Sequence, residues 1–261
     1  MGDNNKMNSK VSVVTISYNS VKSIEKTILS VLSQTYPNIE YIIIDGGSTD
    51  GTKEIIEKYS SKISYWCSEK DNGIYDAMNK GIKKATGEWI NFMNSGDCFA
   101  SESALASVMA QTVEDNICVI YCDAIYDHGD HEMKYVCHKL KDMTYKMVLC
   151  HQSCLIRTSV HKERLFSLKY KIAGDYDFFY NLYFSKGEHV FKYLPIVLAK
   201  NDATDSLSRK FYFYALRENL EVSSAHKNLR WYRDKLRFMI KDFIGWEKNK
   251  NTYIKILRFG R

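Results

Sequence analysis

The chain has 261 residues, 45% of them hydrophobic, which suits one large α/β domain with a buried core and a helical extension. No apolar run reaches the roughly 18 residues that a membrane-spanning helix needs, and the N-terminal MGDNNKMNSK lacks the apolar core of a signal peptide, so we expect a cytoplasmic protein. The net charge of +6 lies in the C-terminal part, since residues 227–261 hold eleven Lys and Arg against three Asp and Glu.

Residues 11–93 predict a parallel sheet. Short, near-continuous apolar runs, typical of strands covered on both faces, alternate with segments whose apolar residues recur at helical spacing. The predicted strands are 11–16, 39–44, 63–67 and 88–93, and the predicted helices are 21–32, 52–59 and 74–85. This βαβαβαβ order indicates a doubly wound α/β fold.

The pattern changes after residue 97. We expect a helix at 101–111, two antiparallel strands at 117–126 and 133–138 around the turn 127–130, and a strand at 153–157. A helix at 176–185, a strand at 189–193, and helices at 211–226 and 229–244 follow. We find no internal repeat and no Pro- or Gly-rich linker that would mark a sharp domain boundary.

Three predicted strands end in small, polar or acidic residues. SYN follows the first strand at 17–19, DGGSTDG ends the second at 45–51, and NSGD follows the fourth at 94–97. In an open parallel sheet the ligand lies beyond the carboxyl ends of the strands, so these residues can reach one ligand together. The sequence therefore predicts a nucleotide or phosphate site at this edge.

The same segments carry a family resemblance. VSVVTISYN, QTYPNIEYIIIDGGSTDGT and EKDNGIYDAMNKGIKKATGEWINFMNSGD stand in the expected order, and AGDYD follows at 173–177. Together they resemble the family 2 glycosyltransferases, inverting enzymes with a GT-A fold that use nucleotide-sugar donors. The resemblance implies a Rossmann-like, mostly parallel sheet with flanking helices, a small antiparallel acceptor portion and a C-terminal helical extension.

The resemblance also implies a set of donor-binding residues. In this set the Tyr18 ring can stack on a pyrimidine, Asp45 suits hydrogen bonds to a uracil or ribose, and Gly46 allows close backbone approach. The alternative for these strand-end residues is that they only turn the chain. The residues assigned to the donor are Ser17, Tyr18, Asn19, Asp45, Gly46, Gly73, Asn79 and Ser95.

The family's Asp-rich motif is depleted in this chain. In the family this motif usually holds Mn²⁺ or Mg²⁺ against the donor diphosphate, since a hard cation prefers oxygen ligands. Here Asn94 and Gly96 stand in place of carboxylates, which leaves Asp97 as the one anionic ligand. We expect Asp97 to hold the metal together with phosphate oxygens and waters, and to bind it weakly without the donor.

The resemblance places the general base at Asp175. An inverting transfer needs one base to take the proton of the acceptor hydroxyl as this attacks the anomeric carbon. A helix cap is the alternative, because Asp175 and Asp177 stand at the start of a predicted helix. The pair His151 and Gln152 resembles one found in some bacterial members. We assign His151, Gln152 and Asp177 to the acceptor or the phosphates, with a structural role for the histidine as the alternative.

The seven cysteines are scattered among apolar neighbours, as buried thiols of a reducing compartment are. A zinc site is the alternative at residues 150–154. The side chains that would join Cys150, His151 and Cys154 there are Cys118, Cys122, Cys137 and His138.

Residues 229–244 combine an apolar stripe with a basic one. This combination is typical of a helix that lies on an anionic membrane, and Trp246 would be an interfacial anchor. Packing of the apolar stripe on the catalytic domain or on a second subunit in a homodimer is the alternative, and no base-reading motif indicates nucleic acid. The apolar stripe is Leu229, Tyr232, Leu236, Met239, Ile240 and Phe243, and the basic stripe is Arg230, Arg233, Arg237 and Lys241.

The predicted organisation is a flexible tail at 1–10, a glycosyltransferase domain at 11–201 and a basic helical extension at 202–261. Residues 11–99 would bind the nucleotide sugar and residues 100–201 the acceptor. The predicted function is transfer of a hexosyl or N-acetylhexosaminyl group from a nucleotide diphosphate, with UDP favoured, to a glycan or lipid-linked oligosaccharide in bacterial surface polysaccharide synthesis.

Two other functions stay open. A nucleotidyltransferase that makes the nucleotide sugar would show a Gly-rich basic loop after the first strand, where this chain offers only Lys22. A non-catalytic binding protein on a transferase scaffold would explain the depleted acidic motif, although Asp97 and Asp175 are both retained.

Overall fold

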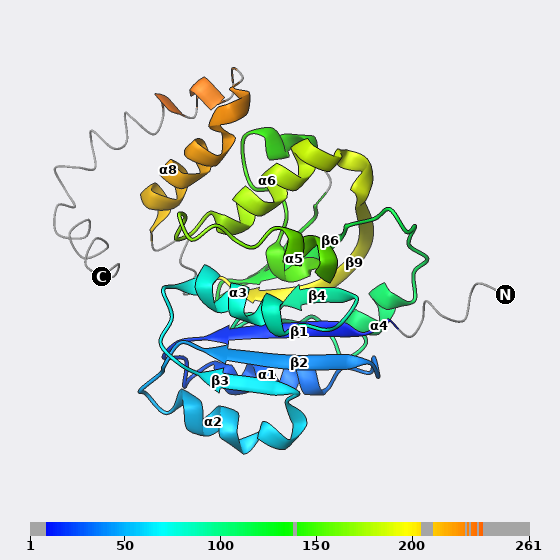
Figure 1. The fold of residues 1–261 in the computed structure, drawn as a ribbon, viewed down its shortest axis with the longest axis vertical. Helices are drawn as coiled ribbons and strands as arrows, with labels where there is room; N and C mark the ends of the chain where they lie inside the picture. Colours follow the sequence, from blue (N-terminus) through cyan, green and yellow to red (C-terminus); the bar gives the residue numbers. More distant parts are fainter. Residues whose placement is uncertain are drawn as a thin grey trace.

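The computed structural model describes residues 9–137, 140–204, 211–227, 229, 231–233 and 235–236, whose helices and strands are shown in Figure 1. A mixed sheet runs through this part of the chain in the order β3-β2-β1-β4-β8-β6-β9-β5, and β7 pairs with β6. Its strands are β1 (Val11–Ser17), β2 (Ile39–Asp45), β3 (Tyr65–Ser68), β4 (Trp89–Phe92), β5 (Cys98–Phe99), β6 (Val119–Asp127), β7 (Glu132–Tyr135), β8 (Cys154–Arg157) and β9 (Phe191–Asp202). The helices are α1 (Ile24–Leu32), α2 (Thr52–Lys58), α3 (Ile74–Lys84), α4 (Ala104–Met109), α5 (Thr158–Glu163), α6 (Gly174–Lys186) and α8 (Tyr212–Val222).

The parallel half of the sheet is the part that the apolar runs predict. β1 pairs in parallel with β2 and β4, and β2 pairs in parallel with β3. Successive side chains of β1 point to opposite faces, so Val14 packs in one core with Ile82 of α3 and Val13 packs in another with Ile28 of α1. The doubly wound arrangement predicted for this half is therefore confirmed.

The second half adds antiparallel pairing. β8 runs antiparallel to β4 and β6, and β6 and β7 form the predicted hairpin. The strand predicted at 189–193 is present as β9, but its predicted end at residue 193 is wrong, because β9 continues to Asp202 beside β6. The register skips Pro195 and Ile196, which lie in a bulge, and a bulge is a place where a strand tolerates proline.

α6 and α8 pack against each other above the sheet in Figure 1. The helix predicted at 211–226 is present as α8 followed by a 3₁₀ turn at Ser223–His226. Of the helix predicted at 229–244, residues 230, 234 and 237–244 lie outside the described residues, as do Trp246 and residues 1–8 of the predicted tail. In the described part no helix is both long enough and apolar enough to cross a bilayer. The predicted domain divisions stay predictions.

Candidate active site

The polar strand ends lie at one edge of the sheet, where the arrowheads of β1, β2 and β3 point in Figure 1. Ser17 and Asp45 are aligned at the ends of β1 and β2. The Gly46 N–H donates to the Ser17 carbonyl at 2.8 Å, and the Ser95 N–H donates to the Ile16 carbonyl at 3.1 Å. The segments that follow β1, β2 and β4 therefore adjoin one another.

Asp45 is fully buried and organises the loop after β2. Its Oδ2 accepts hydrogen bonds from the Gly47 N–H at 3.2 Å, the Ser48 N–H at 2.9 Å and the Ser68 hydroxyl at 2.7 Å. Its Oδ1 accepts a bond from the Ser48 hydroxyl at 2.5 Å. The contacts of Asp45 in the structure are thus with its own loop and β3, and its contact with a base or ribose stays a prediction.

The segment after β1 is tied to the same loop. Asn19 has a positive φ of 49°, and its Oδ1 accepts a hydrogen bond from the Thr49 N–H at 3.0 Å. The Asn19 N–H donates to the Ser48 hydroxyl oxygen at 2.7 Å. Tyr18 is 63% exposed, so its ring offers a free face, whereas the Ser17 hydroxyl is buried without a described partner.

Asp71 joins this group, although the sequence prediction does not assign it to the site. A Cβ on Gly46 would lie 2.5 Å from Asp71 Oδ2 and 3.3 Å from Tyr18 Cδ2, so the three residues meet. Asp71 Oδ1 accepts a hydrogen bond from the Gly73 N–H at 2.9 Å, and burial raises the pKa of the Asp71 carboxyl. The sequence feature that indicates Asp71 is DNG at residues 71–73, which directly precedes a helix and places a carboxylate at the rim of a strand-end site.

Asp97 is buried at the turn after β4. Its Oδ2 accepts a hydrogen bond from Gln152 Nε2 at 2.8 Å, and its Oδ1 accepts one from the Asp202 N–H at 2.9 Å. Burial raises the pKa of Asp97 to about 7. Asn94 Oδ1 and the Ser95 hydroxyl beside it are buried without a described hydrogen-bond partner. The continuation of β9 beyond residue 193, which the sequence prediction misses, brings Asp202 to this turn.

His151 and Gln152 face different surroundings. Gln152 reaches Asp97, but the His151 ring packs among aromatic rings, 5.0 Å from Phe92 and 5.6 Å from Phe166 between centroids. Burial lowers the pKa of His151 to about 4, so this histidine is neutral near pH 7. The structure therefore brings Gln152, and not His151, to the strand-end group.

Asp175 lies in the first turn of α6, beside the start of α3. Its Oδ1 accepts hydrogen bonds from the Tyr176 N–H at 2.9 Å and from the Tyr75 hydroxyl at 3.1 Å. The Tyr75 hydroxyl also bonds the Ile172 carbonyl, and a Cβ on Gly174 would lie 2.7 Å from the Tyr75 ring. Burial raises the pKa of Asp175. Since Gly73 precedes α3 and bonds Asp71, the start of α3 connects Asp71 to Asp175.

Two predicted site residues have other contacts. Asp177 pairs with Arg164 at 3.1 Å and accepts a hydrogen bond from Asn181 Nδ2 at 3.1 Å. Asn79 is buried on α3, and its amide bonds both backbone groups of Phe166, each at 2.9 Å. The structure gives both side chains a role in packing the 164–181 region and does not bring them to the strand-end group.

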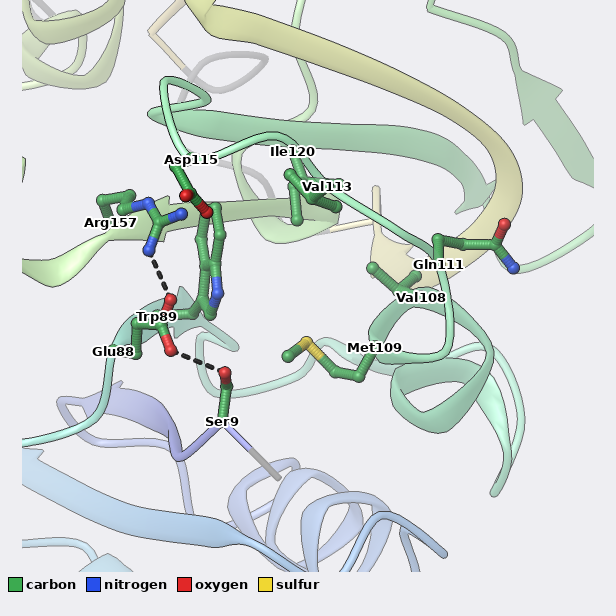
Figure 2. A pocket seen from close by; sticks show the side chains of 10 residues that line it. All are labelled: Ser9, Glu88, Trp89, Val108, Met109, Gln111, Val113, Asp115, Ile120 and Arg157. Carbon is green, nitrogen blue, oxygen red and sulfur yellow. Dashed lines mark hydrogen bonds and ion pairs between the residues drawn. The ribbon is translucent and has the colours of Figure 1, made fainter. Parts of the chain in front are cut away.

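The pocket shown in Figure 2 lies at the opposite, amino-terminal edge, where Trp89 begins β4. Arg157 stacks over the Trp89 ring and pairs with Glu88, which also accepts a hydrogen bond from the Ser9 hydroxyl. The volume of this pocket is about 50 Å³, whereas ligand pockets usually measure roughly 300–1,000 Å³. This pocket is too small for a nucleotide.

The described residues contain no group of three or more His, Cys, Asp or Glu side chains that could hold a metal ion on its own. The seven cysteines are free, and burial raises the pKa of Cys122 and Cys154, which disfavours thiolate ligands. His138, which belongs to the zinc alternative, lies outside the described residues.

Comparison with known families agrees with the strand-end motifs. The family model for Glycosyl transferase family 2 matches residues 12–185. The chain belongs to this family, and the family prediction made from the sequence is confirmed.

Several curated relatives are glycosyltransferases. An uncharacterised glycosyltransferase of Mycobacterium tuberculosis is 43% identical over 105 residues, which cover 40% of this chain and 38% of the relative. A PGL/p-HBAD biosynthesis glycosyltransferase of Mycobacterium bovis is 29% identical over 184 residues, or 69% of this chain and 71% of the relative. The putative teichuronic acid biosynthesis glycosyltransferase TuaG of Bacillus subtilis is 41% identical over 90 residues, which cover 33% of this chain and 36% of TuaG.

Solved structures share the fold. Residues 1–349 of S. aureus TarS, in complex with UDP-GlcNAc, match with a TM-score of 0.65 and 19% identity over 92% of this chain and 76% of that chain. A longer TarS structure is matched over 43% of its length. The mannosyltransferase PcManGT of Pyrobaculum calidifontis, in complex with GDP-Man and Mn²⁺, matches with a TM-score of 0.66 and 14% identity over 90% of this chain and 70% of that chain. The GT-A fold predicted from the sequence is confirmed.

Proposed function

We propose that the chain is an inverting glycosyltransferase that moves a sugar from a UDP-linked donor to a glycan or lipid-linked acceptor of a bacterial surface polysaccharide. The observation that carries the proposal is a half-buried carboxylate, Asp175, connected through the start of α3 to the carboxyl edge of the parallel sheet. Support for the donor comes from the structural match to TarS, which is known in complex with UDP-GlcNAc, and support for the pathway comes from relatives named for PGL/p-HBAD and teichuronic acid biosynthesis.

Asp175 is the proposed general base. Its Oδ1 is held by Tyr75 and Tyr176, which leaves Oδ2 for the proton of the acceptor hydroxyl. The acceptor oxygen bonds the anomeric carbon as the bond to the donor diphosphate breaks, and the hydroxyl proton passes to Asp175. Burial raises the pKa of this carboxyl, which makes it a stronger base than an exposed aspartate.

Tyr18, Asp45 and Asp71 form the proposed base-binding corner. The exposed face of Tyr18 suits stacking on a uracil, and the carboxylate of Asp71 lies beside Gly46, where the backbone allows close approach. Asp45 supports this corner by fixing the 46–48 loop.

The turn after β4 suits a divalent cation. Asp97 and the unpartnered Asn94 Oδ1 and Ser95 hydroxyl supply hard oxygen donors, as Mn²⁺ and Mg²⁺ prefer. Gln152 and the Asp202 N–H hold the Asp97 carboxylate in place. A bound cation would neutralise the charge of the leaving diphosphate.

UDP release from a panel of UDP-sugars, with and without Mn²⁺, tests the proposal. A glycosyltransferase releases UDP when an acceptor is present. A nucleotidyltransferase would instead release pyrophosphate from UTP and a sugar phosphate, and a binding protein would bind UDP without turnover. Either of these two results contradicts the proposed function.

A further inference from the structure

Glu218 of α8 is a buried carboxylate to which the proposed reaction gives no part. It is 3% exposed, and its Oε1 accepts a hydrogen bond from the Lys171 N–H at 2.9 Å. Its Oε2 accepts bonds from the Ile172 and Ala173 N–H groups, each at 2.9 Å. A buried carboxylate is tolerated when donors surround it in this way, so Glu218 and segment 171–173 stabilise each other.

Segment 171–173 leads directly into the turn that carries Asp175. Ala173 is the N-cap residue of α6. The carbonyl of Ile172, whose N–H bonds Glu218, accepts the hydrogen bond of the Tyr75 hydroxyl, and Tyr75 also bonds Asp175 Oδ1. A continuous path of hydrogen bonds therefore runs from α8 through the 171–173 backbone and Tyr75 to the carboxylate.

We propose that Glu218 is a positioning residue of the transfer reaction, through which α8 fixes segment 171–173 and the direction of the Asp175 carboxylate. The inference rests on the proposed role of Asp175 as the base. Electrostatics support it, because the charge of Glu218 adds to burial in raising the pKa of Asp175. Among the described residues, Tyr75 of α3 and Cys154 of β8 are further titratable groups that interact with Asp175.

Glu218→Gln tests the inference, with Glu221→Gln as the matched control. The amide keeps the shape of the side chain but replaces one acceptor oxygen with a donor, so bonds to segment 171–173 are lost. Glu221 lies on the same helix and undergoes the same charge change, but it pairs at 2.5 Å with the exposed Lys169. We expect Glu218→Gln to lower kcat by roughly 10²-fold, as misplacement of a reacting group does, with UDP affinity unchanged. Glu221→Gln should keep the wild-type kcat.

Two further readouts separate positioning from general loss of structure. Removal of the Glu218 charge lowers the pKa of Asp175, so the acid limb of the kcat/KM profile should move to lower pH in Glu218→Gln and stay in place in Glu221→Gln. Amide hydrogen exchange at residues 171–173 should be faster in Glu218→Gln. If that variant does not fold, Glu218→Asp, which keeps the charge but shortens the reach, should lower kcat with the acid limb unmoved.

Wild-type kcat and unchanged exchange at 171–173 in Glu218→Gln would overturn the inference, as would an equal loss in Glu221→Gln. Failure of the base assignment looks different, since Asp175→Asn would then transfer sugar at the wild-type rate, and failure of the proposed function would leave the wild type itself without sugar transfer. The exchange measurement needs no turnover, so it decides in either case whether Glu218 holds the segment.

Discussion

Of the four carboxylates in the proposed site, Asp45, Asp97 and Asp175 accept hydrogen bonds from different kinds of donor, and these donors indicate different roles. Asp45 bonds its own loop and Ser68, which suits a structural support of the base-binding corner. Asp97 accepts hydrogen bonds from a side-chain amide and a backbone N–H, and Asp175 accepts them from a tyrosine hydroxyl and a backbone N–H. Burial raises the pKa of Asp97 and of Asp175, and desolvation of this kind is common where carboxylates bind protons or cations.

Asp175→Asn should abolish transfer and leave UDP binding intact, because the base acts on the acceptor proton and not on the donor. Loss of a general base lowers the rate by about 10²- to 10⁴-fold. Since burial raises the pKa of Asp175, wild-type activity should fall as the pH drops through a value above the usual range for Asp, where the base becomes protonated. Profiles of kcat/KM against pH and calorimetry with UDP measure both effects, and wild-type turnover in the variant would rule out this base.

Asp97→Ala should weaken Mn²⁺-dependent UDP binding strongly, whereas Asn94→Ala should weaken it less. A carboxylate is a better ligand for a hard cation than a neutral amide oxygen. Titration of Mn²⁺ in the presence of UDP, followed by electron paramagnetic resonance, measures the cation directly. Equal Mn²⁺ affinity in Asp97→Ala and the wild type, or activity that is unaffected by EDTA, would contradict the assignment.

At the scale of elements, local patterns predict the parallel half well, because each strand there is a short apolar run and each strand end carries a motif. They fail where a residue's surroundings come from distant parts of the chain. Pro195 lies in a bulge of β9 beside β6, and the strand continues past it. The sequence pattern does not predict this continuation, so it does not predict Asp202 near Asp97. His151 and Gln152 are adjacent in sequence, yet packing against Phe92 buries one while the other reaches Asp97.

The hydrogen bonds that join Asn79 of α3 to Phe166 favour a packing role for this residue over a role in donor binding. Asn79→Ala should leave the Phe166 N–H and C=O without their partner, which lowers the free energy of unfolding by roughly 2–3 kcal/mol. UDP affinity should change little. Asn72→Ala is the control, since its exposed amide bonds only Asp76 among the described residues. Urea unfolding and UDP titration measure both, and weaker UDP binding at unchanged stability would restore Asn79 to the donor site.

At the scale of the whole molecule, the described residues between 229 and 236 contact α8 and expose an apolar face. Trp231 is 4% exposed, and its indole N–H donates to the Leu220 carbonyl at 3.0 Å. Leu229, Tyr232 and Leu236, at helical spacing on another face, are 89%, 56% and 57% exposed. The described part of the chain therefore leaves these three side chains of the apolar stripe exposed.

We predict that this segment binds an anionic membrane surface. Residues 227–261 carry eleven Lys and Arg against three Asp and Glu, and each basic residue near an anionic leaflet contributes about 1 kcal/mol. The exposed apolar face would enter the headgroup region beside them. Flotation with vesicles that contain phosphatidylglycerol should recover the full chain, whereas a variant with Arg230, Arg233, Arg237 and Lys241 changed to Gln should float poorly. Neutral vesicles serve as the control for charge. Equal recovery of both proteins would rule out the basic stripe as the membrane anchor, and recovery of neither together with a dimer in sedimentation would assign the apolar stripe to a second subunit instead.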